Sequence, residues 1–189
     1  GENSEAQTKM GNALNLLMNG NVFLYYGEEL GMKGSGKDEN KRAPMYWSKD
    51  GNAEGMCKGP ADMDDFRMKF DSLEEQQEDP DSIYNYVKQV IRVRNQNPVI
   101  ARGTTAYLEQ YSGEQCFALT RSDENSSLLM LGNTSAETAT VDLSGLTIGK
   151  TAAEELVLLG ELYTGEETAE RTGAEITLPA WSILILGEE

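Results

Sequence analysis

The stretch Val22–Trp47, VFLYYGEELGMKGSGKDENKRAPMYW, decides how this chain can fold. It opens with a run of apolar and aromatic residues, 22–26, which follows the turn signal Asn19-Gly20-Asn21 and ends at Gly27. Such a run predicts a strand buried on both faces of a parallel sheet. Ligands of parallel α/β sheets bind just beyond the carboxyl ends of the strands. We therefore expect the polar, glycine and aromatic residues after Gly27 to form an active-site rim.

Helices are predicted on both sides of this strand. Apolar residues recur at helical spacing across residues 4–18, and again from Ile83 until Asn97-Pro98 stops the pattern. Residues 31–81 show little periodicity, and the stretch is too long for an ordinary connection in a compact domain. Helix, strand, long loop and helix, in this order, indicate one and a half turns of a βα repeat.

After Gly103 the pattern changes to short strands separated by turn residues. The predicted strands are residues 105–110, 115–121, 127–131, 138–143, 155–159, 174–178 and 181–186. Short strands spaced roughly ten residues apart favour an antiparallel β-sandwich. The sequence therefore predicts a first domain over residues 1–103 and a second over residues 104–189.

Five segments resemble, in the same order, the α-amylase family of glycoside hydrolases, family 13. They are YYGEELGM at 25–32, DENKRAPMYW at 38–47, LEEQ with DPDS at 73–76 and 79–82, IRVRNQNP at 91–98, and LPAWSIL at 178–184. In the family these segments resemble the eighth barrel strand, its loop, the two ends of the last barrel helix, and the closing strand. Each segment alone is a weak signal, and their shared order is a strong one.

The resemblance implies an α+β fragment: the end of a (β/α)8 barrel, incomplete over residues 1–103, followed by an antiparallel all-β sandwich over 104–189. A single barrel strand has no neighbours with which to pair, and unpaired backbone groups on a buried strand are costly. The first part is therefore not expected to form a complete domain alone. Self-association is one way in which it could cover its exposed groups.

The resemblance also implies the C-terminal portion of a retaining hydrolase of α-glucans or α-gluco-oligosaccharides, which works by double displacement. In the family the catalytic carboxylates lie on earlier strands, and this chain contains no His at all. Glu28 and Glu29 are adjacent, so on a strand they would point to opposite faces and could not converge on one bond. We therefore assign no catalytic residue and no activity to the chain alone. Gly27 and Glu28 are expected to be structural.

Arg42, Trp47 and Tyr26 are the residues predicted to contact substrate. A guanidinium offers a fixed fork of donors, and the resemblance places the Arg of an RTPMQW-like motif near the sugar at the non-reducing end. This sequence has Ala43 and Tyr46 where that motif has Thr and Gln. The alternative for Arg42 is a loop salt bridge with Asp38 or Glu39, and the alternative for the aromatic residues is packing in the core.

Composition excludes several classes of partner. The formal net charge of −16 and the sequence pI of about 4.4 exclude nucleic acid and anionic membranes, which need clustered Lys and Arg. No apolar stretch is long enough to span a membrane. Cys57 and Cys116 lack metal spacing, and we expect two free thiols, with one disulfide as the alternative. Asp62, Asp64 and Asp65 lack the Gly and Glu of an EF-hand and predict a solvated acidic turn or the start of a helix.

Neither a metal nor a cofactor is therefore expected, and the predicted partner is an α-linked glucan or oligosaccharide. Two other functions stay open for residues 104–189: an independent carbohydrate-binding module, or a purely structural domain. The aromatic residues are few in this part, and Phe117 and Trp181 lie in strand patterns that point inward. The structural alternative is therefore preferred. The sequence leaves location open, and an extracellular or cell-surface parent enzyme is compatible with it.

Overall fold

The structure is a computed structural model that describes residues 4–188. Its contacts divide the chain into two compact units, Gly1–Val22 with Gln89–Glu189, and Phe23–Lys88. The first unit holds every β-strand found in residues 4–188, and the second holds most of the stretch expected to form an active-site rim. The two units are treated separately below, and the expected domain boundary at residue 103 stays a prediction.

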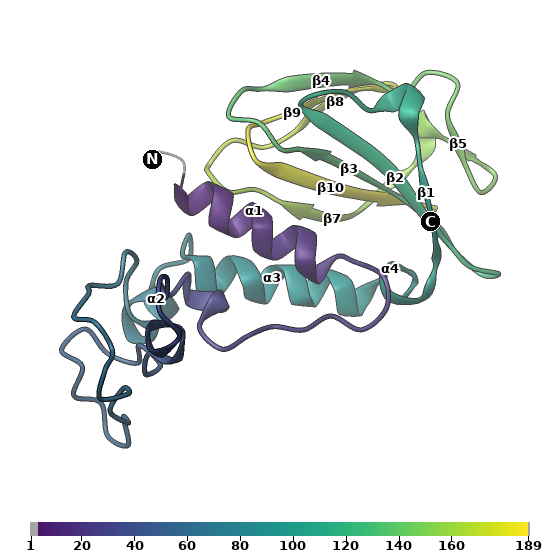
Figure 1. The fold of residues 1–189 in the computed structure, drawn as a ribbon. Helices are drawn as coiled ribbons and strands as arrows, with labels where there is room; N and C mark the ends of the chain where they lie inside the picture. Colours follow the sequence, from purple (N-terminus) through teal and green to yellow (C-terminus); the bar gives the residue numbers. More distant parts are fainter. Residues whose placement is uncertain (1–3, 189) are drawn as a thin grey trace. The chain divides into compact units, whose positions relative to one another are not determined.

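Two antiparallel sheets form most of the first unit (Figure 1). The larger has the order β1 (Thr104–Tyr107), β2 (Cys116–Ser122), β3 (Ser127–Asn133), β10 (Ser182–Gly187), β7 (Val157–Leu162). The smaller has the order β4 (Ala139–Asp142), β9 (Glu175–Leu178), β8 (Glu170–Thr172), and a separate pair joins β5 (Thr147–Ile148) to β6 (Thr151–Ala152). Short 3₁₀ helices, η3 (Glu109–Tyr111) and η4 (Ala153–Glu155), lie between strands. The seven strands predicted after Gly103 are all present, and β5, β6 and β8 were not predicted.

The apolar core of this unit lies between the two sheets. Ala118, Leu129 and Leu184 reach it from the larger sheet, and Ile176 and Leu178 reach it from the smaller one. On β3 and β10 the alternate residues, which point to the opposite face of the sheet, are buried as well: Leu128, Met130, Ile183 and Ile185. Both faces of the central strands are therefore covered, which explains why these two strands read as continuous apolar runs rather than alternating ones.

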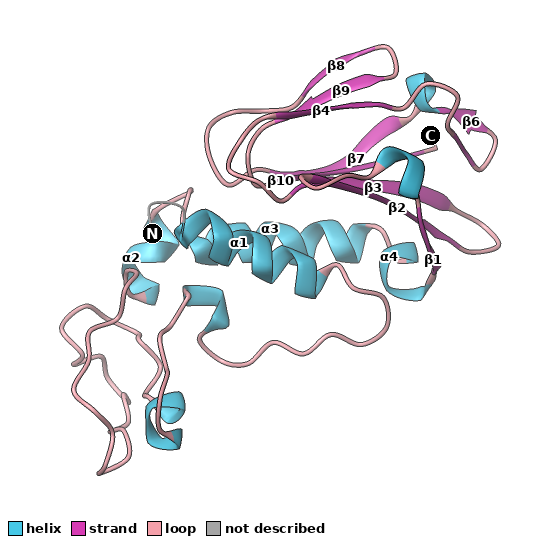
Figure 2. Cartoon of the chain, turned by 45° about the horizontal axis from the view of Figure 1, so that its top comes forward, coloured by secondary structure: helices cyan, strands magenta, loops and turns pink. Residues whose placement is uncertain are grey.

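Helices cover the second face of the larger sheet. They are α1 (Ser4–Leu16) and the part of α3 (Ile83–Gln96) that begins at Gln89, with the short α4 (Val99–Arg102) beyond them (Figure 2). At Gly160 on β7 an added Cβ would lie only 2.7 Å from Val93 Cγ1, so the missing side chain is what allows α3 to approach. Arg121 on β2 donates to the hydroxyl oxygen of Thr105, and to the carbonyl oxygen of Leu17 just past α1 at 3.3 Å.

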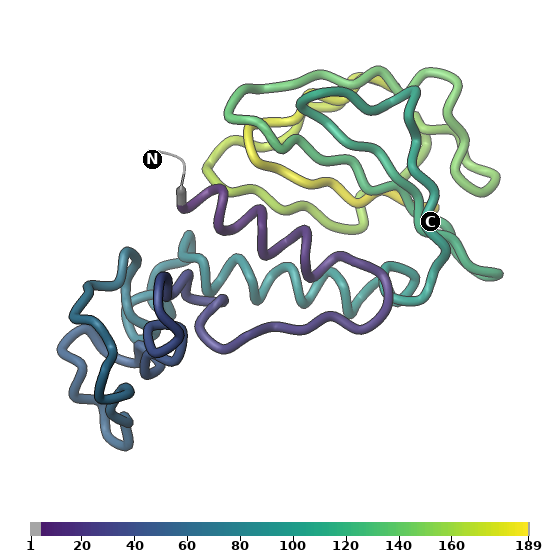
Figure 3. Tube along the Cα trace, viewed as in Figure 1, coloured from purple at the N-terminus to yellow at the C-terminus, as the bar shows by residue number. Residues whose placement is uncertain are grey.

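The second unit, Phe23–Lys88, has little regular structure (Figure 3). It contains η1 (Glu28–Leu30), η2 (Asp38–Arg42), α2 (Leu73–Glu78) and the start of α3. Among the described residues before Thr104 there is no strand, so the strand predicted at 22–26 is wrong for this structure. The segment is instead extended and exposed, with Phe23 at 86% and Tyr25 at 55%. A buried parallel strand needs neighbouring strands, and residues 4–103 offer none.

The predicted fold class is confirmed. A helical first part is followed by antiparallel sheets, which makes the chain α+β. The helix predicted across 4–18 is α1, and the helix predicted from Ile83 is α3.

Candidate functional site

A hollow of about 460 Å³ lies within the second unit, in the region that the sequence marks as an active-site rim. Two stretches line it, one at η1 and one around η2. The lining residues are Tyr25, Tyr26, Gly27, Glu28, Met32, Lys33, Gly34, Asp38, Asn40, Lys41, Arg42 and Ala43. Four of the five predicted site residues therefore border one hollow: Tyr26, Gly27, Glu28 and Arg42.

Gly27 makes the turn at which the first stretch changes direction. Its φ of 88° lies in the left-handed region, and its carbonyl oxygen accepts hydrogen bonds from the N–H groups of Leu30, at 3.1 Å, and Met32, at 2.9 Å. A Cβ at this position would lie 2.5 Å from Met32 Sδ. Both the backbone conformation and the close approach therefore require glycine here.

The two adjacent glutamates lie on the 3₁₀ helix η1 and not on a strand, which corrects the premise used to separate them. The Glu28 carboxylate accepts a hydrogen bond from Tyr25 N–H at 3.2 Å, and the Glu29 carboxylate accepts one from Gly27 N–H at 2.8 Å. Each carboxylate thus folds back onto the backbone that precedes η1. This geometry matches the structural contact expected for Glu28, whose role stays a prediction.

Arg42 ends η2 and forms two ion pairs. Its Nη2 lies 3.1 Å from an Asp38 carboxylate oxygen and 3.5 Å from a Glu39 carboxylate oxygen. The Arg42 side chain is 53% exposed, so solvent weakens both pairs. The loop salt bridge considered as the alternative is therefore present in the structure. It also holds the guanidinium at the edge of the hollow, where donors remain available.

Tyr26 spans the two stretches. Its hydroxyl donates a hydrogen bond to the carbonyl oxygen of Ala43 at 3.0 Å, and its ring centroid lies 4.8 Å from that of Tyr25. The pKa of Tyr26 is raised, mainly by its partial burial and to a smaller extent by the neighbouring Tyr25. Tyr26 is 44% exposed, so one part of the ring stays open to the hollow while its hydroxyl ties η1 to the residue after η2.

Asn40, the buried residue of η2, is hydrogen-bonded to Asp64, and sequence reasoning missed the roles of both. Asn40 is 5% exposed, and its amide donates to Ser35 O and to the Asp64 carboxylate, both at 2.8 Å. Asp64 N–H donates back to Asn40 Oδ1 at 2.9 Å, and Lys37 Nζ lies 2.7 Å from the same carboxylate. The bonds from Lys37 and Asn40 lower the pKa of Asp64. Asp64 is thus a partner of the η2 loop and more than a solvated acidic turn.

Trp47 is not among the residues that line the hollow. Its side chain is 44% exposed, and its backbone carbonyl accepts a hydrogen bond from Glu74 N–H at 3.1 Å. Trp47 is therefore an exposed aromatic residue of the same unit, and its predicted contact with a ligand stays a prediction.

The metal-ligating side chains, the cysteines and the helices of residues 4–188 are described next. Within this range no group of three or more His, Cys, Asp or Glu side chains is arranged to hold a metal ion. Cys57 is exposed and Cys116 is buried, and both are free thiols. Every described helix is too short or too polar to cross a membrane. What the hollow does offer is a guanidinium, two lysines, carboxylates and tyrosine rings around one opening.

Known proteins with similar sequences or structures belong with these observations on the site. The family model "Alpha amylase, catalytic domain" matches residues 1–103. Among solved structures, Eubacterium rectale Amy13B is 41% identical with a TM-score of 0.92, over 100% of this chain and 35% of that chain. Among curated proteins, Alpha-amylase 3 of Dictyoglomus thermophilum is 32% identical over 88 residues, or 47% of this chain and 18% of that protein. Trehalose synthase of Thermus thermophilus is 28% identical over 142 residues, or 69% of this chain and 15% of that protein. The chain thus spans less than a fifth of either curated relative.

Proposed function

This chain belongs to the α-amylase family, whose catalytic-domain model matches residues 1–103, and from that membership we propose that it forms one wall of a sugar-binding cleft in an enzyme acting on α-linked glucans or oligosaccharides. Its partner would be the sugar itself. Residues 104–189 would serve as a structural domain.

The hollow bordered by Tyr26, Glu28 and Arg42 is the observation that carries this proposal. Sugars are recognised by planar donors and acceptors that meet their hydroxyl groups and by aromatic rings that pack on their apolar faces. The Arg42 guanidinium supplies the donors, and the exposed part of the Tyr26 ring supplies the face.

The chain alone would carry out no hydrolysis. A retaining mechanism needs a nucleophilic carboxylate and an acid about 5 Å apart on either side of the scissile bond. Glu28 and Glu29 are adjacent carboxyls, and each accepts a hydrogen bond from nearby backbone. The resemblance assigns the reacting carboxylates to earlier strands, so the contribution of this chain is binding and orientation.

Exposure of aromatic residues supports a structural role for the β-domain. Among the described residues from 104 onward, Tyr107 is the one aromatic side chain that is exposed, at 61%. Trp181 directs its indole N–H into the interior. A sugar-binding module normally presents more than one open ring, because stacking on successive sugars supplies its affinity.

A chimeric enzyme tests the proposal. The matching 35% of E. rectale Amy13B would be replaced by this chain, which aligns over its whole length, and hydrolysis of malto-oligosaccharides would be compared with that by Amy13B itself. We expect a folded chimera that keeps activity on the α-glucans that Amy13B accepts. The 189-residue chain alone should release nothing from a nitrophenyl maltoside. A folded but inactive chimera, or turnover by the repurified chain alone, would contradict the proposal.

A further inference from the structure

We propose that the short helix α2 positions the η1 side of the candidate sugar site together with the segment that carries Trp47, and that Gln76 is the positioning residue through which it fixes the turn at Glu28. This inference rests on the proposed function for its meaning, although its geometry stands independently. It also gives a physical role to the segment LEEQ with DPDS, which the site described above does not use.

The start of α2 is held by its own first turn. The N–H and hydroxyl groups of Ser72 both donate to the Glu75 carboxylate, at 3.1 and 2.8 Å, and Ser72 is fully buried. Lys49 Nζ lies 3.0 Å from the same carboxylate. The Ser72 side chain in turn accepts from Glu75 N–H, which completes a capping box. Reciprocal capping of this kind fixes where a helix begins, so the position of α2 is well defined relative to the residues that it contacts.

The first contact of α2 is with the segment that carries Trp47. Leu73 N–H donates to Tyr46 O at 2.9 Å, and Glu74 N–H donates to Trp47 O at 3.1 Å. The first N–H groups of any helix have no partner inside the helix. Here the backbone beside the exposed tryptophan accepts those bonds, so α2 fixes the place of Trp47.

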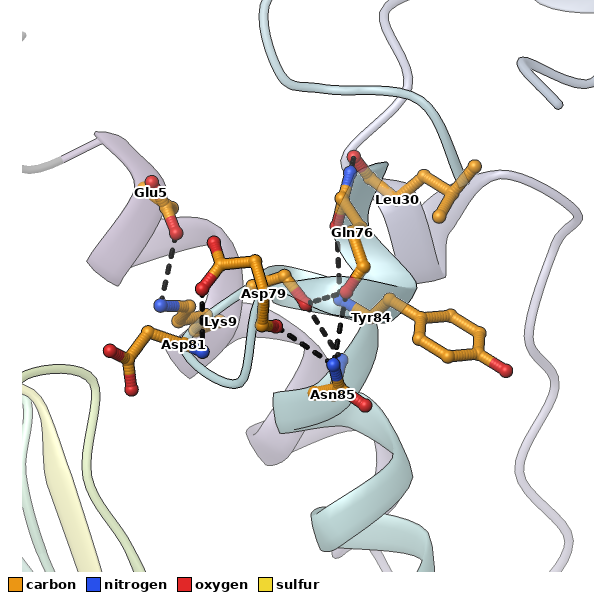
Figure 4. A network of polar contacts seen from close by, with 9 residues as sticks. Glu5, Lys9, Leu30, Gln76, Asp79, Asp81, Tyr84 and Asn85 are labelled. Carbon is orange, nitrogen blue, oxygen red and sulfur yellow. Dashed lines mark hydrogen bonds and ion pairs between the residues drawn. The ribbon is translucent and has the colours of Figure 1, made fainter. Parts of the chain in front are cut away.

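The second contact is with η1 and runs through Gln76 (Figure 4). The Gln76 side chain is 3% exposed, and its Nε2 donates to Leu30 O at 3.0 Å and to Asp71 O at 2.7 Å. Its Oε1 accepts a hydrogen bond from Tyr84 N–H at 3.0 Å, at the start of α3. Two donors and one acceptor on the same side chain are all used, and only an amide supplies both kinds of group in this geometry.

The position of the Leu30 carbonyl determines the position of Glu28. Leu30 ends η1, and Gly31 N–H returns to Glu28 O at 3.0 Å. Gly31 has a φ of 64°, and an added Cβ would lie 2.6 Å from the Phe70 ring and 2.8 Å from Ile83. The turn between η1 and the next residues is therefore packed closely on one side and hydrogen-bonded to Gln76 on the other. Loss of the Gln76 hydrogen bonds should therefore increase the mobility of Glu28 and Gly27 first.

Amide hydrogen exchange on the complete chain tests this role, because it needs no sugar. In Gln76→Glu, the carboxylate that replaces the amide would face Leu30 O and Asp71 O without a proton to donate. We expect the amides of Leu30, Gly31 and Met32 to exchange at least about tenfold faster than in the parent chain at neutral pH. Gln77→Glu puts the same charge on an exposed neighbour in α2, and it should leave these amides unchanged.

A change of pH separates positioning from general damage to the helix. Burial and the two facing carbonyl oxygens raise the pKa of the introduced carboxyl above its ordinary value, so on acidification to about pH 4 it regains a proton and one donor, and the difference from the parent chain should shrink. Amides of β3 and β10 report whether the first unit is folded. If Gln76→Glu does not fold, Gln76→Met removes the donors without adding charge. The exchange rates of the same three amides, those of Leu30, Gly31 and Met32, then test the positioning role.

Equal exchange in the Gln76 variant and the parent chain, or equal acceleration in Gln77→Glu, would overturn the proposal. A parallel titration of the parent chain with maltotriose, followed by the amide shifts of Gly27 and Glu28, tests the proposed function separately. Absence of any shift in the parent chain would count against sugar binding, while the exchange result would still decide whether Gln76 positions the turn.

Discussion

Asn40 and Asp64 hold one another by two hydrogen bonds that run in opposite directions, from Asn40 Nδ2 to the carboxylate at 2.8 Å and from Asp64 N–H to Asn40 Oδ1 at 2.9 Å. They lie 24 residues apart, and between them runs most of the irregular part of the second unit. A single buried amide therefore closes a loop that has no sheet and little helix to define it.

Asn40→Ala should destabilise this loop more than its size suggests. The change removes the buried amide that bonds Ser35 O, the Asp64 carboxylate and Asp64 N–H, and each such hydrogen bond contributes about 0.5–1.5 kcal/mol net. We expect faster amide exchange across residues 35–42, measured by mass spectrometry. Asn52→Ala, at an exposed position of the same unit, is the matched control. Equal exchange in the two variants would show that the reciprocal pair contributes nothing.

Removing the buried Tyr86 hydroxyl is predicted to stabilise the chain rather than destabilise it. The hydroxyl has no hydrogen-bond partner among the described residues, so Tyr86→Phe should stabilise the chain by about 1 kcal/mol at neutral pH. Burial also raises the pKa of Tyr86. Below the unfolded pKa of about 10 the hydroxyl is neutral in both states, and above it the unfolded tyrosine ionises while the buried one stays neutral, so the stability of the parent chain falls as pH rises. The advantage of Tyr86→Phe should therefore grow from pH 9 to pH 11.

Thermal melts at several pH values measure both effects. Tyr107→Phe, which removes an exposed hydroxyl, is the control and should follow the parent chain at every pH. A Tyr86→Phe curve that is parallel to that of the parent chain would mean that the buried hydroxyl does not titrate with unfolding.

Arg94 supplies a cap for the end of α1. Its guanidinium donates to Leu16 O at 2.7 Å, to Met18 O at 2.5 Å and to Gly20 O at 2.6 Å. The last carbonyls of a helix have no partner inside it, so Arg94→Ala should cost about 2 kcal/mol, or roughly 4–8 °C in the melting temperature. Arg92 lies on an exposed face of α3, the helix that also carries Arg94, and Arg92→Ala should leave the melting temperature within about 1 °C of that of the parent chain. Similar melting temperatures for both variants would remove Arg94 as a cap.

Arg42 distinguishes substrate contact from a loop salt bridge. In the active chimera, Arg42→Ala should lower kcat/KM about tenfold or more if the guanidinium orients a sugar, and Arg42→Lys should also be impaired because an ammonium lacks the planar fork. If the ion pairs with Asp38 and Glu39 are its whole role, both variants should keep near-normal kinetics. Steady-state kinetics on short malto-oligosaccharides beside a thermal melt decide between the two, with Lys58→Ala as the surface control.

Limited proteolysis should cut the second unit first. Between Gly31 and Asp81 the only regular elements are η2 and α2, and local opening is easiest where few buried contacts oppose it. Trypsin should therefore cleave after Lys58, Arg67 or Lys69, which are exposed, before it cleaves after Lys150, which is exposed in the β5–β6 turn. Cleavage after Lys150 at an equal rate would imply that the two units are equally resistant.

The sequence predicts the β-domain well and the candidate site only in part. Strands such as β2 and β10 are predicted to within about two residues, because apolar runs bounded by turn residues leave few alternatives. The three exposed residues of β8, Glu170–Thr172, carry no apolar pattern, so nothing in the sequence could mark them. The strand predicted at 22–26 fails for a different reason, because a parallel strand is defined by its neighbours as much as by its own residues.

At the site, a local signal existed for α2 but not for the contacts that it makes. Ser72 followed by Glu75 is a capping-box pattern, which predicts the helix start that the structure contains. The bond from Gln76 to Leu30 spans 46 residues, and no spacing rule reaches that far. Sequence reasoning therefore finds the residues that carry a motif and misses the partners that hold them in place.

The bond from Arg121 to the carbonyl oxygen of Leu17 spans 104 residues, and this has a consequence for how the chain is made. At roughly 5–20 residues per second, the ribosome would release α1 several seconds before β2 emerges. During that interval the apolar side of α1, with Met10, Ala13 and Leu16, has no sheet to cover it. A nascent chain stalled before β2 should therefore bind a chaperone through this helix, and one stalled beyond β10 should not.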